Sequence, residues 1–379
     1  MKGRLESLDV LRGFDMFFIF LPDPVPCIVL TFCAMFGWEH SAFAQQFDHC
    51  AWNGLRFYDC IFPLFLFISG VTFPFSYASQ RRRGMTRAQS VRKALVRGLT
   101  LFLLGAMLWT TIDGVVEKNV LSFEWSTFRV WSVIGRIGIA WTAAAILFMF
   151  FGRKTRIGIV AAILVGMWML MRFAVAPGAP EGVNPMVDSQ WLWANWVDVN
   201  FLTTAHRGEG GVSTVTMVAT AMFGTFAGEM LLGEDDRCRC GKVVRLLLFA
   251  VLLTVAGLLM AFAFGPYSLP INKPVWSSSF ALVAGGVSAA LLALFYWIID
   301  VRGWRRWGFF FKVIGMNAIT VYLLMRTVFN WDFESRYFFG GIASLFPPAA
   351  GAFVTQAGMI ALVWLILYWL YRKNVFLRV

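Results

Sequence analysis

Long apolar runs separated by short polar segments extend through the whole chain. A membrane-spanning helix needs about 20 mostly apolar residues, and about ten stretches reach that length. We expect crossings at residues 13–31, 58–79, 94–115, 131–151, 157–176, 212–233, 244–264, 277–300, 309–328 and 351–371. The pattern predicts an all-α fold, a polytopic transmembrane helical bundle with about ten crossings, built as a single domain of residues 1–379.

The basic residues gather in alternate connections of this bundle. Of the 33 Lys and Arg residues, 24 lie in residues 1–13, 80–98, 151–157, 234–245, 301–312 and 371–379. Basic residues favour the cytoplasmic side of a membrane. Both termini are therefore expected in the cytoplasm, which makes the number of crossings even.

The composition agrees with a lipid environment. Apolar residues make up 59% of the chain and charged residues 14%, whereas a soluble protein is about 25% charged. The net charge of +12 follows from the bias of basic residues toward the cytoplasm, so no nucleic-acid partner is expected. The N-terminal segment does not have the form of a cleavable signal peptide.

The sequence motifs exclude several enzyme classes. No phosphate-binding glycine loop, HExxH zinc motif or Gly-x-Ser-x-Gly elbow occurs, which disfavours an ATP-driven machine, a zinc protease and an α/β-hydrolase. Cys238 and Cys240 supply two of the four ligands that a structural zinc ion requires. We therefore expect no metal.

The three histidines, His40, His49 and His206, all fall in connections on the expected non-cytoplasmic side. His49 stands out because Asp59 follows ten residues later, at the mouth of a predicted span. A histidine that a carboxylate orients is suited to proton transfer near neutral pH. An ordinary solvated loop histidine is the alternative interpretation.

Charged residues inside predicted spans are costly and suggest function. Asp15 and Asp23 lie along the first span, and prolines on both sides of Asp23 predict a broken helix there. Arg136 lies in the fourth span. It either pairs with one of these acids in a structural role or binds an anion.

Two further segments are polar where a span begins. Residues 209–216 contain Ser213, and residues 270–279 contain Asn272 and Lys273. The free N–H groups of a helix start can hold an anion or a polar substrate, and capping by Ser and Thr is the alternative. Trp191, Trp193 and Trp196, in the connection 177–211, form either an interfacial belt or a wall for sugar stacking.

These segments occur in an order that resembles one family. The motifs are Arg4-Leu5-x-Ser7-Leu8-Asp9-x-x-Arg12-Gly13, His49-x-x-Trp52-Asn53-Gly54-Leu55, Asp59-x-x-Phe62-Pro63-x-Phe65, Gly135-Arg136-Ile137-Gly138, the Gly211-to-Gly228 segment, Pro270-Ile271-Asn272-Lys273 and Gly315-Met316-Asn317. Together, over nearly the whole chain, they resemble the heparan-α-glucosaminide N-acetyltransferase family and its bacterial relatives.

The resemblance implies a transmembrane acyltransferase that takes acetyl from cytoplasmic acetyl-CoA and delivers it to a sugar across the membrane. The family's catalytic histidine corresponds to His49. An asparagine at the end of the family's first span corresponds by position to Asp23, so this sequence departs from the human pattern. Asp23 would then orient either the acceptor or His49.

The expected roles follow from both lines of argument. We assign catalysis to His49, Asp23 and Asp59, acetyl-CoA binding to Arg136, Ser213, Asn272, Lys273 and Asn317, and acceptor binding to Trp52, Asn53 and Asp15.

The expected acceptor is an amino sugar of the glucosamine type, as a free sugar or a small glycan. The expected location is the bacterial inner membrane, where a homodimer is an open alternative to a monomer. Two other functions stay open, a transporter of a sugar or small anion and an O-acetyltransferase of a cell-envelope glycan.

Overall fold

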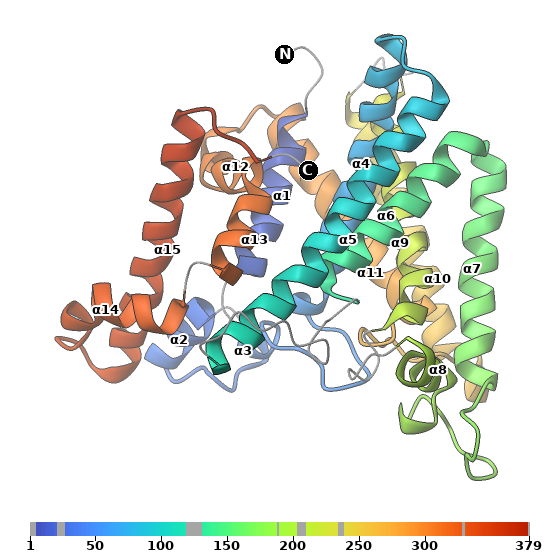
Figure 1. Cartoon of the computed structure of the whole chain (residues 1–379), viewed down its shortest axis with the longest axis horizontal. Coiled ribbons are helices and arrows are strands. Elements are labelled where there is room, and N and C mark those ends of the chain that lie inside the picture. The colour runs from blue at the N-terminus through green and yellow to red at the C-terminus, as the bar shows by residue number, and fades with distance from the viewer. Residues whose placement is uncertain are drawn as a thin grey trace. The chain divides into compact units, whose positions relative to one another are not determined.

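The computed structural model describes residues 5–20, 27–118, 131–187, 189–202, 210–233, 239–327 and 330–377. Their regular secondary structure is helical, apart from one isolated bridge between Val175 and Leu192 (Figure 1). The predicted all-α fold is therefore confirmed.

The chain divides into two compact units. The first comprises Met1–Cys50, Arg56–Phe65 and Leu294–Val379, and the second comprises Ala51–Leu55 and Leu66–Ala293. The prediction of a single domain stays a prediction.

Seven helical segments among the described residues are long and apolar enough to cross a membrane. They are Phe57–Arg82, Val133–Phe150, Arg153–Phe173, Gly211–Leu232, Arg239–Phe262, Ser278–Val301 and Pro348–Arg372. Each coincides with a predicted crossing to within a few residues. Seven of the ten predicted crossings thus have a matching helix.

The other three predicted crossings are not among these seven segments. Residues 309–328 form two helices, α12 (Phe309–Met316) and α13 (Ala318–Thr327), with a bend of 63° between them. Residues 94–115 lie within α5 (Arg87–Lys118), whose side chains are described up to residue 107. Residues 13–31 comprise parts of α1 (Glu6–Phe20) and α2 (Cys27–Met35), and residues 21–26 lie outside the described ranges.

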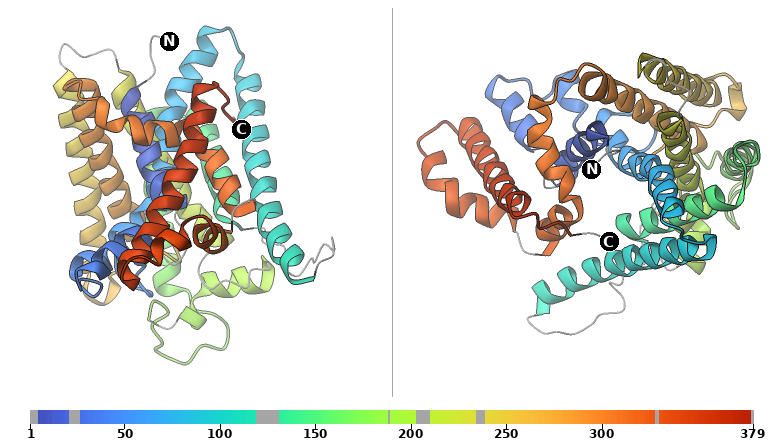
Figure 2. Two further views of the ribbon diagram at one scale, coloured as in Figure 1. Left: turned by 90° about the vertical axis from the view of Figure 1, so that its left-hand side faces the viewer. Right: turned by 90° about the horizontal axis from the view of Figure 1, so that it is seen from above.

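The first unit is organised around α1. This helix packs against α12 and α13, and α15 (Pro348–Arg372) packs against α2, α12 and α14 (Trp331–Ala343). Met16 of α1 joins Ile314, Val321 and Val363 in a buried apolar cluster. α15 ends at the same end of this unit at which α1 begins (Figures 1 and 2).

Two glycines allow α1 and α12 to cross in close contact. A Cβ atom at Gly13 would overlap the carbonyl group of Phe311, and one at Gly315 would overlap the carbonyl oxygen of Asp9. The Arg12-Gly13 and Gly315-Met316-Asn317 motifs therefore include a packing requirement that only glycine meets.

The second unit contains α5, α6 (Val133–Phe150), α7 (Arg153–Phe173), α8 (Trp193–Phe201), α9 (Gly211–Leu232) and α10 (Arg239–Phe262). It also contains most of α4 (Ile61–Arg82) and of α11 (Ser278–Tyr296). α5 and α6 lie side by side in every view (Figures 1 and 2). α9 packs against α6, α7, α8 and α10, and 78% of its apolar window is buried.

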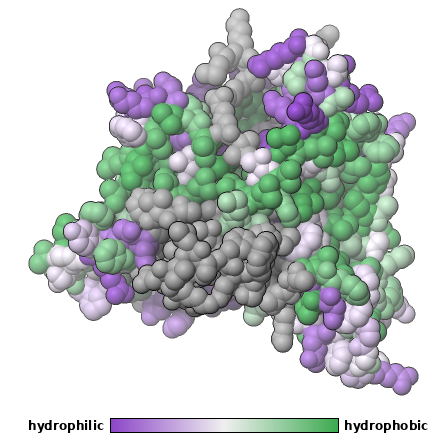
Figure 3. Space-filling model, in the orientation of Figure 1, coloured by the Kyte–Doolittle hydropathy of each residue, from purple (hydrophilic) through white to green (hydrophobic). Residues whose placement is uncertain are grey.

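The outer helices of the second unit expose apolar side chains. Only 28% of the apolar window of α7 and 22% of that of α10 is buried. Figure 3 shows hydrophobic side chains over much of the visible surface, with hydrophilic ones toward the ends of the helices. Apolar helices that are this exposed are stable in lipid rather than in water, so the chain has the surface of an integral membrane protein.

Candidate functional site

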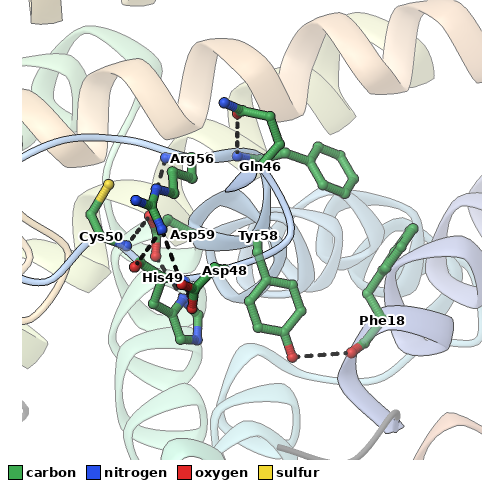
Figure 4. Close-up of polar contacts among 9 residues, drawn as sticks. Phe18, Gln46, Asp48, His49, Cys50, Arg56, Tyr58 and Asp59 are labelled. Carbon is green, nitrogen blue, oxygen red and sulfur yellow. Dashed lines mark hydrogen bonds and ion pairs between the residues drawn. The ribbon is translucent and has the colours of Figure 1, made fainter. Parts of the chain in front are cut away.

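His49 and Asp59, predicted as a pair, form a direct contact in the first unit (Figure 4). His49 Nδ1 lies 2.8 Å from Asp59 Oδ1. The carboxylate is buried, with 1% of its side chain exposed, whereas 42% of the His49 side chain is exposed. A buried acid thus holds a histidine whose ring remains accessible.

Local backbone structure fixes the position of Asp59. The residue lies in a short 3₁₀ turn, Phe57–Cys60, directly before α4. Asp59 Oδ2 accepts hydrogen bonds from the backbone N–H groups of Arg56, at 3.1 Å, and of Cys50, at 3.3 Å. The bond to Arg56 is half of a capping box. Each carboxylate oxygen therefore has a donor, which offsets the cost of burying its charge.

This arrangement selects one tautomer of His49. The carboxylate is an acceptor, so Nδ1 carries the proton and donates it to Asp59 Oδ1. Nε2 then carries the lone pair and can accept a proton. A carboxylate that orients an imidazole in this way is the common arrangement of a general base or a nucleophile activator.

The loop around His49 is held by several other contacts. Arg56 Nη1 donates to the carbonyl oxygen of His49 at 3.0 Å and lies 3.2 Å from Asp48 Oδ2. The Tyr58 ring lies 4.6 Å from the His49 ring between centroids, and its hydroxyl donates to Phe18 O at 3.4 Å. These contacts restrict the ring position without burying it (Figure 4).

Cys50 lies beside the same carboxylate. Burial and the negative charge of Asp59 raise the pKa of its thiol, against a smaller opposing effect of Arg56. The neutral thiol is therefore favoured near pH 7, which makes Cys50 a poor nucleophile.

The second half of the His49–Leu55 motif belongs to the second unit. Trp52 Nε1 and Asn53 Nδ2 both donate to the carbonyl oxygen of Met186, at 2.8 Å and 3.2 Å. Asn53 Oδ1 accepts from Asn272 Nδ2 at 3.1 Å. Asn272, which is fully buried, accepts from the Val275 N–H at 3.1 Å. Two predicted acceptor residues, the partly buried Trp52 and the exposed Asn53, thus share a hydrogen-bond network with the buried Asn272, a predicted cofactor residue.

Lys273, a predicted cofactor residue, lies in the loop that precedes α11. Its carbonyl oxygen accepts from Trp276 N at 3.0 Å. Trp276 is 1% exposed and has a φ of 50°. Such a backbone angle is strained for a bulky residue and persists only where the surrounding structure enforces it. Ser277 caps α11 by accepting from Phe280 N, so here the predicted serine capping is confirmed.

Arg136 and Ser213 lie together in the second unit. Arg136 is 1% exposed, and its Nη1 lies 3.5 Å from Ser213 Oγ. The start of α9 is capped by Asp198, whose Oδ1 accepts from Val212 N at 3.1 Å, whereas Ser213 Oγ donates to the carbonyl oxygen of Gly210. The alternative of Ser and Thr capping is therefore wrong for this helix.

Asp198 also acts on Arg136 electrostatically. Burial raises the pKa of the Asp198 carboxyl, while the N–H groups of Val212 and Gly211 and the charge of Arg136 oppose the rise. The sequence prediction missed Asp198, since nothing in the sequence around α8 marks it as the cap of another helix.

Asp15 and Asn317 are buried in the first unit. They are 0% and 1% exposed, and within the described residues neither side chain has a hydrogen-bond partner. Asn317 sits at the break between α12 and α13. Buried polar groups without partners in the protein keep their hydrogen-bonding capacity for a bound polar group.

Some sequence predictions remain untested. Asp23 and His206 lie outside the described ranges. In the part of the chain that the structure describes, no three His, Cys, Asp or Glu side chains gather as a metal site, and the absence of a metal stays a prediction. The role of the tryptophans near α8 also stays open.

Comparison with known proteins supports the resemblance predicted from the motifs. No protein-family model matches the chain. It is 23% identical over 436 residues to human heparan-alpha-glucosaminide N-acetyltransferase, an alignment that covers 100% of this chain and 60% of the relative. It is 24% identical over 383 residues to the mouse protein of the same name, covering 87% and 54%.

The chain thus spans little more than half the length of these curated relatives, and the similarity extends over most or all of its own length. The predicted resemblance is confirmed: the chain is similar to the heparan-alpha-glucosaminide N-acetyltransferases of human and mouse.

Proposed function

We propose that this protein is a membrane acetyltransferase that moves acetyl from cytoplasmic acetyl-CoA to an amino sugar of the glucosamine type on the non-cytoplasmic side. The observation that carries the proposal is the His49–Asp59 pair. A buried carboxylate orients an accessible imidazole within a motif that resembles one of an acetyltransferase family. The similarity to the two named relatives supports the choice of reaction.

The chemistry follows from the geometry of His49. The acceptor nitrogen attacks the thioester carbonyl carbon of acetyl-CoA, and His49 Nε2 takes a proton from that nitrogen. The tetrahedral intermediate then expels the CoA thiolate, which His49 reprotonates. Asp59 stabilises the imidazolium that forms between these steps.

A second route uses the same residue as a nucleophile. His49 Nε2 attacks the thioester first, releases CoA and carries the acetyl group to the acceptor. Both routes need the tautomer that Asp59 selects. The release of CoA from acetyl-CoA without acceptor would favour the carrier route.

The other predicted site residues keep proposed roles. Arg136, Ser213, Lys273 and Asn317 are proposed to bind acetyl-CoA, and Asp15 is proposed to bind the amino group of the acceptor. Asp23 is proposed to orient the acceptor or His49. The hydrogen bonds of Trp52, Asn53 and Asn272 inside the protein favour a supporting role for these three residues.

The proposed topology has about ten crossings in the bacterial inner membrane, with both termini in the cytoplasm. The alternation of basic connections along the sequence supports it. The connection that carries His49 would then face the acceptor, while CoA stays on the side of the basic loops. Acetyl alone would cross the membrane, and the CoA nucleotide would not.

A transporter of a sugar or small anion is the second candidate. The break between α12 and α13, together with the buried carboxylate of Asp15, favours it, because broken helices and buried charges are frequent at transport sites. Counter-flow of labelled sugar in proteoliposomes without acetyl-CoA separates the two candidates.

The decisive experiment is an acetyl-transfer assay with purified protein in liposomes. Radiolabelled acetyl-CoA is supplied on one side, with glucosamine and a panel of sugars on the other. His49→Gln should lower kcat by about 10²–10⁴, the usual contribution of a general base, and should leave thermal stability and CoA binding unchanged. His40→Gln, at an exposed loop histidine of the same unit, is the matched control. Wild-type turnover by His49→Gln would refute the catalytic assignment.

A further inference from the structure

An open cleft of about 520 Å³ lies in the second unit, at the end of α9 that follows the Gly211-to-Gly228 segment. Phe148, Arg153, Glu229, Leu232 and Gly233 line it. These residues come from the end of α6, the start of α7 and the end of α9, and the turn between α6 and α7 can be followed in Figure 1. Because three predicted spans end here, the cleft lies at the depth of lipid headgroups.

The buried Arg156 contacts Phe148 and Glu229, two of the residues that line this cleft. Arg156 is 4% exposed, and its guanidinium lies 4.4 Å from the ring centroid of Phe148. Its Nη2 donates to Glu229 Oε1 at 2.6 Å. Among the described residues, Arg156 Nε and Nη1 and Glu229 Oε2 are buried without hydrogen-bond partners. Two donors and one acceptor thus lack partners beside the cleft.

The helix ends around the cleft add charge of both signs. α7 begins after Gly152 without a side-chain cap, so its first N–H groups and Arg153 favour an anion. α9 ends at Leu232, where Lys242 Nζ already donates to the carbonyl oxygen of Leu231 at 2.8 Å, so the Glu229 carboxylate is the group at this end that favours a further cation or N–H donor. The cleft is therefore complementary to a ligand that carries an anionic group next to a protonated amine.

The surroundings of the cleft are apolar and exposed. Phe150, Phe151, Ile157 and Leu232 are 53%, 44%, 51% and 36% exposed. Leu232 itself lines the cleft, and the other three lie within four residues of Phe148 or Arg153 in the chain. Acyl chains would cover these side chains, whereas a water-soluble nucleotide would leave them in water.

We propose that this cleft binds the headgroup of an aminophospholipid with a primary ammonium, the chemistry of phosphatidylethanolamine. The phosphate accepts hydrogen bonds from Arg153 and from the first N–H groups of α7, while the buried Arg156 adds positive charge next to the cleft, and the ammonium binds the Glu229 carboxylate. The acyl chains lie along Phe151 and Ile157. This site is independent of the reaction proposed for His49.

The ligand itself supplies the sharpest test. Lipid binding to the purified, full-length protein is measured by native mass spectrometry, with lipids of identical chains and a headgroup carrying zero to three N-methyl groups. Trimethylation removes every N–H donor. We expect about tenfold weaker binding of the trimethylated lipid, from the loss of one charge-assisted hydrogen bond.

Variants of exposed or partly exposed residues provide the second test. Glu229→Gln should abolish the preference for the primary ammonium, because it removes the charged acceptor. Arg153→Ala should weaken binding of all these lipids by a similar factor and keep their order. Arg92→Ala, at an exposed arginine of the same unit, should change neither.

Three results would overturn the proposal. One is equal binding of the unmethylated and trimethylated lipids by the wild-type protein. Another is an unchanged preference in a Glu229→Gln variant whose melting temperature equals that of the wild type. The third is displacement of the bound lipid by 3′,5′-ADP, which would assign the cleft to the nucleotide of CoA.

Discussion

The two halves of the His49–Leu55 motif differ in how their polar groups are used. His49 keeps 42% of its side chain exposed and has one ring nitrogen fixed by a buried acid. Asn53, four residues later, uses both ends of its amide within the protein, toward Met186 and Asn272. His49 Nε2 remains available to a substrate, whereas both ends of the Asn53 amide form hydrogen bonds within the protein.

This difference separates catalysis from support within one motif. A group that acts on a substrate must keep hydrogen-bonding capacity for it, whereas a group that positions the backbone uses that capacity in the folded state. The motif therefore marks a site, but the contacts of each side chain decide its role. The following substitutions probe the two halves in order of expected effect.

Asp59→Asn should have the largest effect. The asparagine Oδ1 can still accept from the N–H groups of Arg56 and Cys50, and its NH₂ group then faces His49 Nδ1. An NH₂ donor favours the tautomer with the proton on Nε2, which cannot act as a base. We expect kcat to fall by about 10²–10⁴, by analogy with the loss of an orienting carboxylate in catalytic triads.

The matched control is Asp48→Asn, at a neighbouring carboxylate whose side chain is 61% exposed. It should retain most of the activity. Turnover measured beside the melting temperature distinguishes catalysis from structure, because loss of the orienting carboxylate should lower kcat in a variant that melts like the wild type. A variant with normal kcat and lowered melting temperature would make Asp59 a structural residue.

The His49 half was predictable from the sequence for a physical reason. A histidine ten residues before an acid at a helix mouth is a local pattern, and a short turn is enough to bring the two together. The Asn53 half was not, because Trp52 bonds a backbone carbonyl 134 residues away. Every residue has such a carbonyl, so no sequence signal identifies Met186 as the partner.

Asn272→Ala tests the supporting half and should act on stability. The substitution leaves the buried Val275 N–H without a partner, and it also removes the bond to Asn53 Oδ1, an exposed group that water can then hydrate. The unpartnered Val275 N–H should lower the free energy of unfolding by about 1–3 kcal/mol. Denaturation of the purified protein measures this loss, and Asn200→Ala, at an exposed asparagine, is the control.

Kinetics of the Asn272→Ala variant distinguish a supporting role of Asn272 from a role in binding acetyl-CoA. If Asn272 only supports the loop, the folded variant keeps the KM for acetyl-CoA and the pH profile of the wild type. A raised KM at unchanged stability would instead favour the sequence prediction that Asn272 binds acetyl-CoA. The double variant with Asn53→Ala should lose less than the sum of the single variants, since the two side chains share one bond.

The fold was predictable where apolar length alone decides the structure. Seven spans follow directly from runs of about 20 apolar residues. The bend between α12 and α13 was not predicted, because hydropathy does not distinguish a straight span from two helices joined at Asn317. Capping of α9 by Asp198 was missed for a similar reason, since the cap comes from a different helix.

Cys50→Ser should have the smallest effect and tests whether the reactive half contains a second nucleophile. Burial and the charge of Asp59 raise the pKa of the Cys50 thiol. The thiol is therefore neutral at pH 7 and forms a thiolate only at a higher pH than an ordinary cysteine does. Turnover should change by about twofold or less, which corresponds to about 0.5 kcal/mol in the activation free energy. Maleimide labelling of Cys50 should be slow at pH 7 and rise with pH, and in Asp59→Asn it should be faster, because the neighbouring negative charge is gone. Loss of acetyl transfer in Cys50→Ser would identify the Cys50 thiol, rather than His49, as the acetyl carrier.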